Sequence, residues 1–98
     1  MEATAAAIAD PTRRRVLELV RDRELAAGQI AGEFEISRPA VSRHLRVLRR
    51  AGLVDERREG RLRLYRADPE PLEELRTWLD AYWSGRLAAL KALAEEER

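Results

Sequence analysis

With 98 residues, the chain is long enough for one hydrophobic core and too short for a second domain. It contains no cysteine, which excludes disulfides, thiolate metal sites and a cysteine nucleophile, and no apolar run approaches the ~18 residues of a membrane span. The net charge is only +1, but ten basic and three acidic residues give segment 37–66 a charge of +7 between two acidic segments. A basic segment of this kind predicts a polyanionic partner.

The first two elements are predicted to be helices. Residues 3–9 are rich in alanine and suit a short helix with a smooth surface. Asp10 and Pro11 mark the start of a second helix, because Asp is a favoured N-cap and Pro loses no backbone donor at the first helical position. We expect the second helix to bury one apolar face and to turn outward Arg13, Arg14 and Arg21.

A helix–turn–helix pattern follows in the middle of the chain. Segment 25–34 places apolar residues at helical spacing, namely Ala27, Ile30, Ala31 and Phe34. Ser37 is a suitable cap for the next helix, about 38–51, and Gly52 stands where a glycine commonly ends a helix. The apolar stripe of that helix consists of Val41, Leu45 and Leu48.

Beyond Leu53 the apolar period changes from 3.6 to 2, which predicts a β-hairpin over about 54–67 with a tight turn at Glu59-Gly60. Four arginines lie at or near its tip: Arg57, Arg58, Arg61 and Arg63. Asp68-Pro69 then starts a final helix over about 70–95. The predicted fold is mainly α with a two-stranded β-hairpin wing, a winged helix-turn-helix that forms a single domain over residues 1–98.

The helix over about 38–51 has the composition of a DNA-reading helix. When its apolar stripe faces the core, the outward face holds Arg38, Pro39, Ser42, Arg43 and Arg46. Ser42 is small enough for close approach to the major groove, and Arg43 is able to pair with guanine or with a phosphate. Arg46 is placed to meet a phosphate, and the backbone donors near Ser37 suit another. Together with the basic hairpin, this face favours DNA binding over a merely solvated helix surface.

Two stretches resemble the ArsR/SmtB family of bacterial winged-helix repressors: Ala9–Arg14 and Ser37–Val54. The hairpin tip Arg57–Arg61, with the strand ending in Leu64-Tyr65, resembles the wing of that family, so the resemblance covers essentially the whole chain. It implies a homodimer that binds an imperfect inverted repeat in double-stranded DNA and represses transcription. It further places four residues at base-reading positions, Arg38, Pro39, Ser42 and Arg43, and two beside the wing tip, Arg58 and Arg61.

The metal sensors of this family carry a Cys-x-Cys pair after Glu-Leu, where this chain has Ala26 and Gly28. Other members carry Asp/His clusters in the last helix, which has no histidine here. The resemblance therefore favours a branch that does not sense metals, and we expect neither a metal site nor a cofactor. Release from DNA is left to an unknown small-molecule effector near the aromatic cluster, a protein effector, or a change in repressor concentration. That cluster comprises Trp78, Tyr82 and Trp83.

The final helix also predicts a homodimer. It would be ~40 Å long at 1.5 Å per residue, and its apolar stripe is longer than one small core is able to cover. A second copy is expected to cover the rest of the stripe. The smooth helix over 3–9 is expected to join this interface. The predicted interface residues are Ile8, Leu75, Leu79, Tyr82, Trp83 and Leu90. Gly85 marks a candidate kink.

Other functions fit the residues less well. Ser42 and the only histidine, His44, lie two apart on one helix and face different ways, and no glycine-rich phosphate loop is present, so no enzyme activity is expected. His44 either contacts DNA or, as we favour, packs passively at the edge of the helices. A winged helix for protein contact alone predicts a neutral wing, and RNA binding predicts more stacking aromatics than Tyr65. Without a signal-peptide pattern, the expected location is the cytoplasm.

Overall fold

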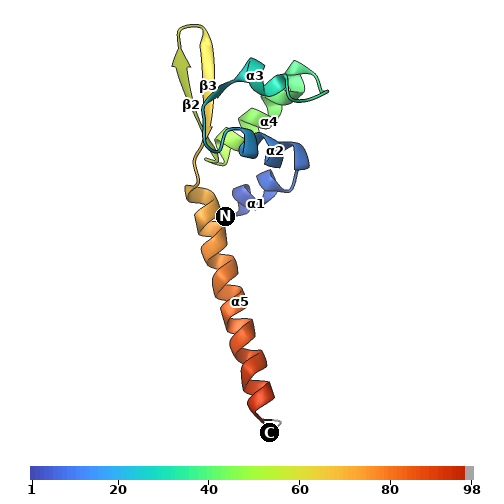
Figure 1. Cartoon of the computed structure of the whole chain (residues 1–98), viewed down its shortest axis with the longest axis vertical. Helices are drawn as coiled ribbons and strands as arrows, with labels where there is room; N and C mark the ends of the chain where they lie inside the picture. The colour runs from blue at the N-terminus through green and yellow to red at the C-terminus, as the bar shows by residue number, and fades with distance from the viewer. Residues whose placement is uncertain (97–98) are drawn as a thin grey trace.

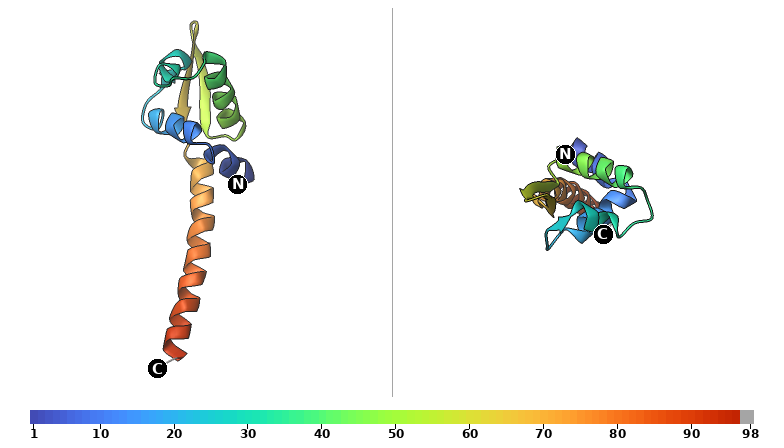
Figure 2. Two further views of the ribbon diagram at one scale, coloured as in Figure 1. Left: turned by 90° about the vertical axis from the view of Figure 1, so that its right-hand side faces the viewer. Right: turned by 90° about the horizontal axis from the view of Figure 1, so that it is seen from above.

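The computed structural model describes residues 1–96, which form five helices and three strands (Figure 1). In chain order these are α1 (Glu2–Ile8), α2 (Pro11–Leu19), β1 (Leu25–Ala26), α3 (Ala27–Ala31), α4 (Arg38–Arg50), β2 (Val54–Glu59), β3 (Leu62–Ala67) and α5 (Glu70–Glu96). The hairpin and α5 project from opposite ends of the body, and the longest dimension is 67 Å (Figures 1 and 2). The winged helix-turn-helix predicted from the sequence is confirmed.

The sheet has one more strand than predicted, in the antiparallel order β1-β3-β2. Leu25 pairs with Tyr65 in β3, and both side chains are buried, so segment 25–26 is a strand and not the first turn of a helix. The helix expected over 25–34 was therefore wrong at both ends, because α3 covers only Ala27–Ala31. The hairpin has the predicted bounds, with Glu59 opposite Leu62 and Gly60 at φ 61° in the turn.

The core lies between the helices and the inner face of the sheet. Its largest fully buried side chains come from α2 and its C-cap, from α3 and α4, and from the segment after α4: Val16, Val20, Ile30, Val41, Leu48 and Leu53. Two backbone hydrogen bonds fix the end of the sheet to this core, from Ala67 N to Val20 O (3.0 Å) and from Asp68 N to Leu53 O (2.9 Å). The apolar stripe of α4 therefore faces inward as predicted, and the opposite face of that helix is left outward.

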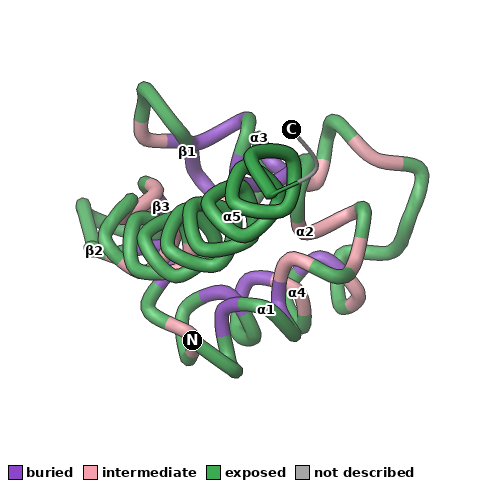
Figure 3. Tube along the Cα trace, turned by 90° about the horizontal axis from the view of Figure 1, so that it is seen from below, coloured by how far each residue is buried: buried purple, intermediate pink, exposed green. Residues whose placement is uncertain are grey.

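Helix α5 runs without interruption from Glu70 to Glu96, through Gly85, the candidate kink position. Its N-terminal part lies against the body, where Leu72 packs against the core. No residue of the described part of α5 is buried, and Figure 3 shows it coloured as exposed over nearly all its length. Within residues 1–96 no helix is both long and apolar enough to cross a membrane.

Asp10 caps α2 as the sequence predicts. Its Oδ1 accepts hydrogen bonds from the backbone N–H of Thr12 (2.8 Å) and of Arg13 (3.2 Å). Partial burial opposes ionisation, but these two hydrogen bonds and the positive charge of Arg13 outweigh it and lower the pKa of Asp10. The ionised carboxylate is therefore the form that stabilises the fold.

We expect Asp10→Ala to lower the free energy of unfolding by about 0.5–2 kcal/mol at neutral pH. Because the folded state lowers the pKa of Asp10, its ionisation stabilises the protein above the ordinary aspartate value and ceases to do so as the pH falls through the folded value. The gap between wild type and variant should therefore close in acid. Urea unfolding from neutral to acidic pH measures this, with the exposed Asp55→Ala as control. Equal effects of the two substitutions would contradict the assignment of Asp10 as the cap.

Candidate nucleic-acid interface

The predicted base-reading residues form one exposed face of α4. Ser37 caps this helix, its Oγ accepting a hydrogen bond from the backbone N–H of Ala40 (3.2 Å). The buried stripe fixes the roll of the helix, and the five predicted side chains on the opposite side are all exposed: Arg38, Pro39, Ser42, Arg43 and Arg46. A face with a small hydroxyl between arginines suits contacts with base edges and phosphates.

The four arginines at or near the tip of the hairpin separate into two kinds. Arg57 makes a two-pronged ion pair with Glu24, with Nε–Oε2 at 2.6 Å and Nη2–Oε1 at 2.8 Å, and its hydrogen bonding lowers the pKa of Glu24. Arg63 pairs with Glu56. Arg58 and Arg61 are exposed, and neither has an acidic partner within residues 1–96. These two arginines are therefore the unpaired cations near the wing tip, and they are the two that the resemblance places beside it.

Glu56 connects the reading helix to the wing. Its Oε2 lies 2.8 Å from Nη1 of Arg49 in α4, and its Oε1 lies 3.5 Å from Nη1 of Arg63 in β3. The Glu56 side chain is only 12% exposed, and it lies in an open recess of about 280 Å³ between α4 and the sheet. Sequence reasoning missed this connection. The available signal was position, because Glu56 shares the inward side of β2 with Val54 and stands opposite Tyr65.

Tyr65 lines the same recess. Burial, followed by the nearby Glu56 carboxylate, raises the pKa of the Tyr65 hydroxyl, which therefore stays protonated.

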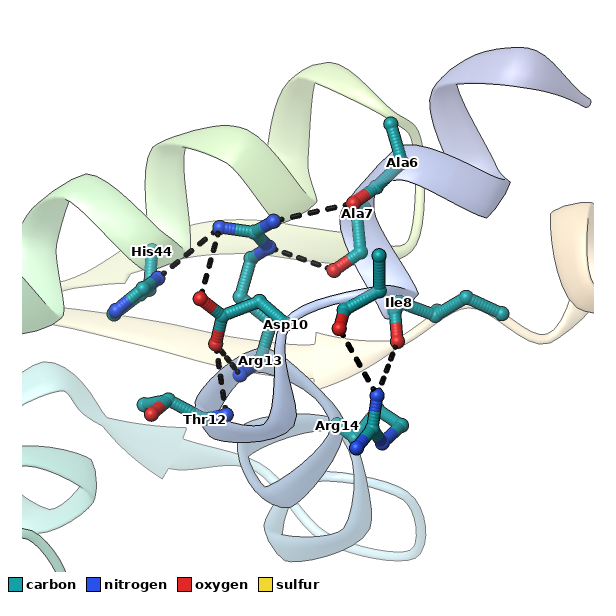
Figure 4. Close-up of polar contacts among 9 residues, drawn as sticks. Ala6, Ala7, Ile8, Asp10, Thr12, Arg13, Arg14 and His44 are labelled. Atoms are coloured by element: carbon teal, nitrogen blue, oxygen red, sulfur yellow. Dashed lines mark hydrogen bonds and ion pairs between the residues drawn. The ribbon is translucent and has the colours of Figure 1, made fainter.

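Arg13 does not point outward, contrary to the sequence analysis. Its side chain is 17% exposed and reaches back to α1, where Nε donates to the carbonyl of Ala7 (2.7 Å) and Nη2 to that of Ala6 (3.2 Å) (Figure 4). The last carbonyls of a helix lack hydrogen-bond donors within it, and the guanidinium of Arg13 supplies donors to those at the end of α1. Arg14 does the same from the surface, donating to Ile8 O at 2.8 Å. The remaining guanidinium nitrogen of Arg13 lies 3.3 Å from Nδ1 of His44, in agreement with a packing role for that histidine.

Of the residues predicted for a dimer interface, Ile8 ends α1 and the other five lie along one side of α5. Leu75 is half-buried near the body, whereas the exposed fraction is 39% for Leu79 and 56% for Leu90. Tyr82 stacks on Trp78 with ring centres 5.9 Å apart and meets Trp83 edge-on at 5.6 Å. These rings lie along the outside of a single helix, and about half of each side chain is exposed.

The remaining candidates for a functional site are the possible metal ligands and the possible catalytic pair Ser42 and His44. Among residues 1–96 no three His, Asp or Glu side chains come together in a way that could hold a metal ion. His44 is committed to Arg13, and Ser42 lies on the outward face of α4, so the two do not form a nucleophile–base pair.

Comparison with known proteins decides the family. Residues 10–56 match the family described as "Bacterial regulatory protein, arsR family". The chain is 44% identical over 91 residues to the HTH-type transcriptional regulator Rv2034 of Mycobacterium tuberculosis, and this alignment covers 93% of the chain and 85% of that protein. The chain belongs to the ArsR family.

Two further likenesses agree with this ArsR-family membership. The chain is 37% identical over 73 residues to the transcriptional repressor SdpR of Bacillus subtilis, covering 74% of the chain and 81% of SdpR. It superposes with a TM-score of 0.82 on the ArsR-like transcriptional regulator from Rhodococcus sp. RHA1, at 34% identity over 97% of the chain and 90% of that structure. The chain is thus a DNA-binding transcriptional regulator and not an enzyme.

Proposed function

We propose that this ArsR-family regulator binds double-stranded DNA as a homodimer, with α4 of each copy in a major groove and each wing tip on the flanking backbone. The observation that carries the proposal is the exposed arginine face of α4, together with two exposed wing-tip arginines that have no acidic partner in the described chain. Ser42 and Arg43 read base edges beside Arg38 and Pro39. Arg46, Arg58 and Arg61 bind phosphates, as do the backbone N–H groups of Ser37 and Arg38 at the start of α4.

The homodimer is supported by the exposed apolar side of α5. Leu79, Tyr82, Trp83 and Leu90 are too large a set of exposed apolar side chains for a helix that remains in water. A second copy is the occupant that fits, because an identical helix offers a matching apolar stripe and a two-fold axis buries both at once. Ile8 and Leu75 extend this surface toward the body, where α1 contacts α5.

Two-fold symmetry determines the form of the DNA site. Two reading helices related by a two-fold axis require an inverted repeat, whose half-sites lie about one helical turn of DNA, ~34 Å, or a multiple of it apart. Occupation of such a site within a promoter obstructs transcription. We therefore assign the chain as a repressor, in line with its likeness to SdpR, and the cytoplasm is the compartment in which it would meet its promoters.

The wing provides the experiment that tests the DNA contacts. We expect Arg58→Ala and Arg61→Ala to weaken binding on every sequence alike and to reduce the slope of log affinity against log salt by about 1 for each lost phosphate contact. Mobility-shift titrations at several salt concentrations measure both quantities.

Arg57→Ala is the matched control, because it removes the same charge from the same hairpin but from a side chain already held by Glu24. Its salt slope should equal that of the wild type. If all three variants retained the wild-type slope, the wing would not be on the DNA backbone.

Metals are not expected to release this regulator from DNA. Soft metals such as cadmium need thiolates, of which the chain has none, and zinc or nickel sites need several converging imidazoles or carboxylates. Addition of zinc, nickel, cadmium or arsenite to a preformed protein–DNA complex should leave the complex intact. Stoichiometric dissociation by any of them, reversed by a chelator, would contradict this proposal. The signal for release is then an unknown small-molecule or protein effector, or the concentration of the repressor itself.

A further inference from the structure

Arg13 is the polar link between three helices (Figure 4). It stands in the first turn of α2, donates to the carbonyls of Ala6 and Ala7 at the end of α1, and contacts Nδ1 of His44 in α4. The Asp10 carboxylate, which caps α2, lies 3.8 Å from the same Nη1 that faces the histidine. One side chain therefore holds the end of α1 and the middle of α4 in a fixed relation.

The space between α1 and α4 makes this link important. The alanines of α1 are too short to fill the gap to α4 and leave an open recess of about 300 Å³, lined by Ala3, Ala6, Ala7, Arg13, Val47, Arg50 and Ala51. Tight apolar packing would hold two helices together without a polar contact, but a recess of this kind does not. The guanidinium of Arg13 is thus a principal contact between α1 and α4, and a movement of one helix acts on the other through it.

The chemistry of the link selects an arginine and a defined form of the histidine. A guanidinium carries five N–H donors in one rigid plane and is always charged, whereas an ammonium is a single point of charge. Because arginine has no acceptor, Nδ1 of His44 must accept, and the neutral ring then carries its proton on Nε2.

We propose that Arg13 is a positioning residue that couples α1 to the DNA-reading helix, so that a displacement of α1 changes the affinity for DNA. The proposal rests on the proposed function, in which α1 borders the dimer interface and α4 enters the major groove. His44 directly follows Arg43, so the contact with Arg13 holds α4 in place next to the base-reading residues. A partner or ligand that moves α1 would thereby release the regulator from DNA without touching the DNA surface.

A double-mutant cycle on DNA affinity tests the coupling. Arg13→Met retains the apolar stem and removes every donor, and His44→Leu removes the acceptor. We expect each to weaken binding by about tenfold, and the double variant to be no weaker than either single variant, because both break the same contact. Arg15→Met is the control, since Arg15 is exposed on α2 and pairs with Glu18, and it should change affinity by less than about twofold.

Two conservative variants separate positioning from charge and from DNA contact. Arg13→Lys keeps the charge but not the fork of donors, so it should bind DNA as weakly as Arg13→Met. His44→Asn keeps an acceptor near the place of Nδ1 and should restore most of the affinity. If the two single effects add instead, so that the double variant is weakened about a hundredfold, His44 acts separately from Arg13 and the coupling is wrong.

A spectroscopic measurement makes the test independent of folding losses. In the wild type, long-range ¹H–¹⁵N correlation spectra should show His44 as the Nε2–H tautomer, and Arg13→Lys should alter that signature. A wild-type ring protonated at Nδ1 would overturn the proposal even if Arg13→Met failed to fold. Failure of the wild type to dimerise or to bind DNA would count against the proposed function instead, so the two failures are distinguishable.

Discussion

Replacing Leu87 and Leu90 together by glutamate should convert the dimer to a monomer and weaken binding to the full DNA site by about a hundredfold or more. The two leucines are 63% and 56% exposed and lie outside the core of a single copy, so the winged helix itself should remain folded. In a dimer, binding of one half-site makes binding of the second effectively intramolecular, and that advantage commonly amounts to about 10²–10⁴ in affinity. Loss of the dimer removes it.

Sedimentation equilibrium and mobility shift on the same preparations measure the two effects, with far-UV circular dichroism to confirm the fold. Ala92→Glu is the matched control, because it adds a charge to the same helix on the side turned away from the leucines. It should leave a dimer with nearly full affinity. A Leu87/Leu90 variant that is monomeric yet binds DNA as tightly as the wild type would show that the dimer is not needed.

Arg43→Ala should cost about 1–3 kcal/mol at a specific site and relax the base preference at one position of each half-site. The side chain is exposed in the reading helix, beside the small Ser42, and has no acidic partner within residues 1–96. Loss of a base contact lowers specific affinity more than non-specific affinity, because the phosphate contacts survive. Competition with a panel of single-base variants of the site measures the preference directly.

Arg50→Ala is the comparison for Arg43→Ala. Seven residues separate the two positions, so they lie on nearly the same side of α4, but Arg50 stands two turns nearer the helix end. Its loss should weaken all sequences alike and leave the base preference unchanged. If Arg43→Ala behaved in the same way, Arg43 would be a phosphate contact and not a reader of bases.

Most of the fold could be predicted from the sequence, because most helices and strands are determined by residues close together in the chain. The spacing of Val41, Leu45 and Leu48 decides which side of α4 faces inward, and this in turn places every predicted residue of the reading face. The alternation after Leu53 and the turn at Gly60 determine the hairpin register. These signals span a few residues each, so no distant partner is needed to interpret them.

The features that the sequence did not reveal depend on contacts between different elements. The strand β1 exists because Leu25 pairs with Tyr65, and two residues are too few for a local strand pattern. Arg57 and Arg58 are adjacent residues of the same type. Only the position of Glu24, 33 residues before Arg57, decides which of them forms an ion pair. Arg13 turned inward because α1 ends beside it, which helical periodicity alone does not show.

Selection of DNA sites in vitro with the purified full-length protein tests the central claim most directly. A two-fold pair of reading helices predicts that the recovered sequences converge on one inverted repeat, with half-sites about one DNA turn or a multiple of it apart. Two protomers should occupy each recovered site. Recovery of no common sequence, or of a single half-site bound by one protomer, would contradict a homodimer that reads DNA through α4.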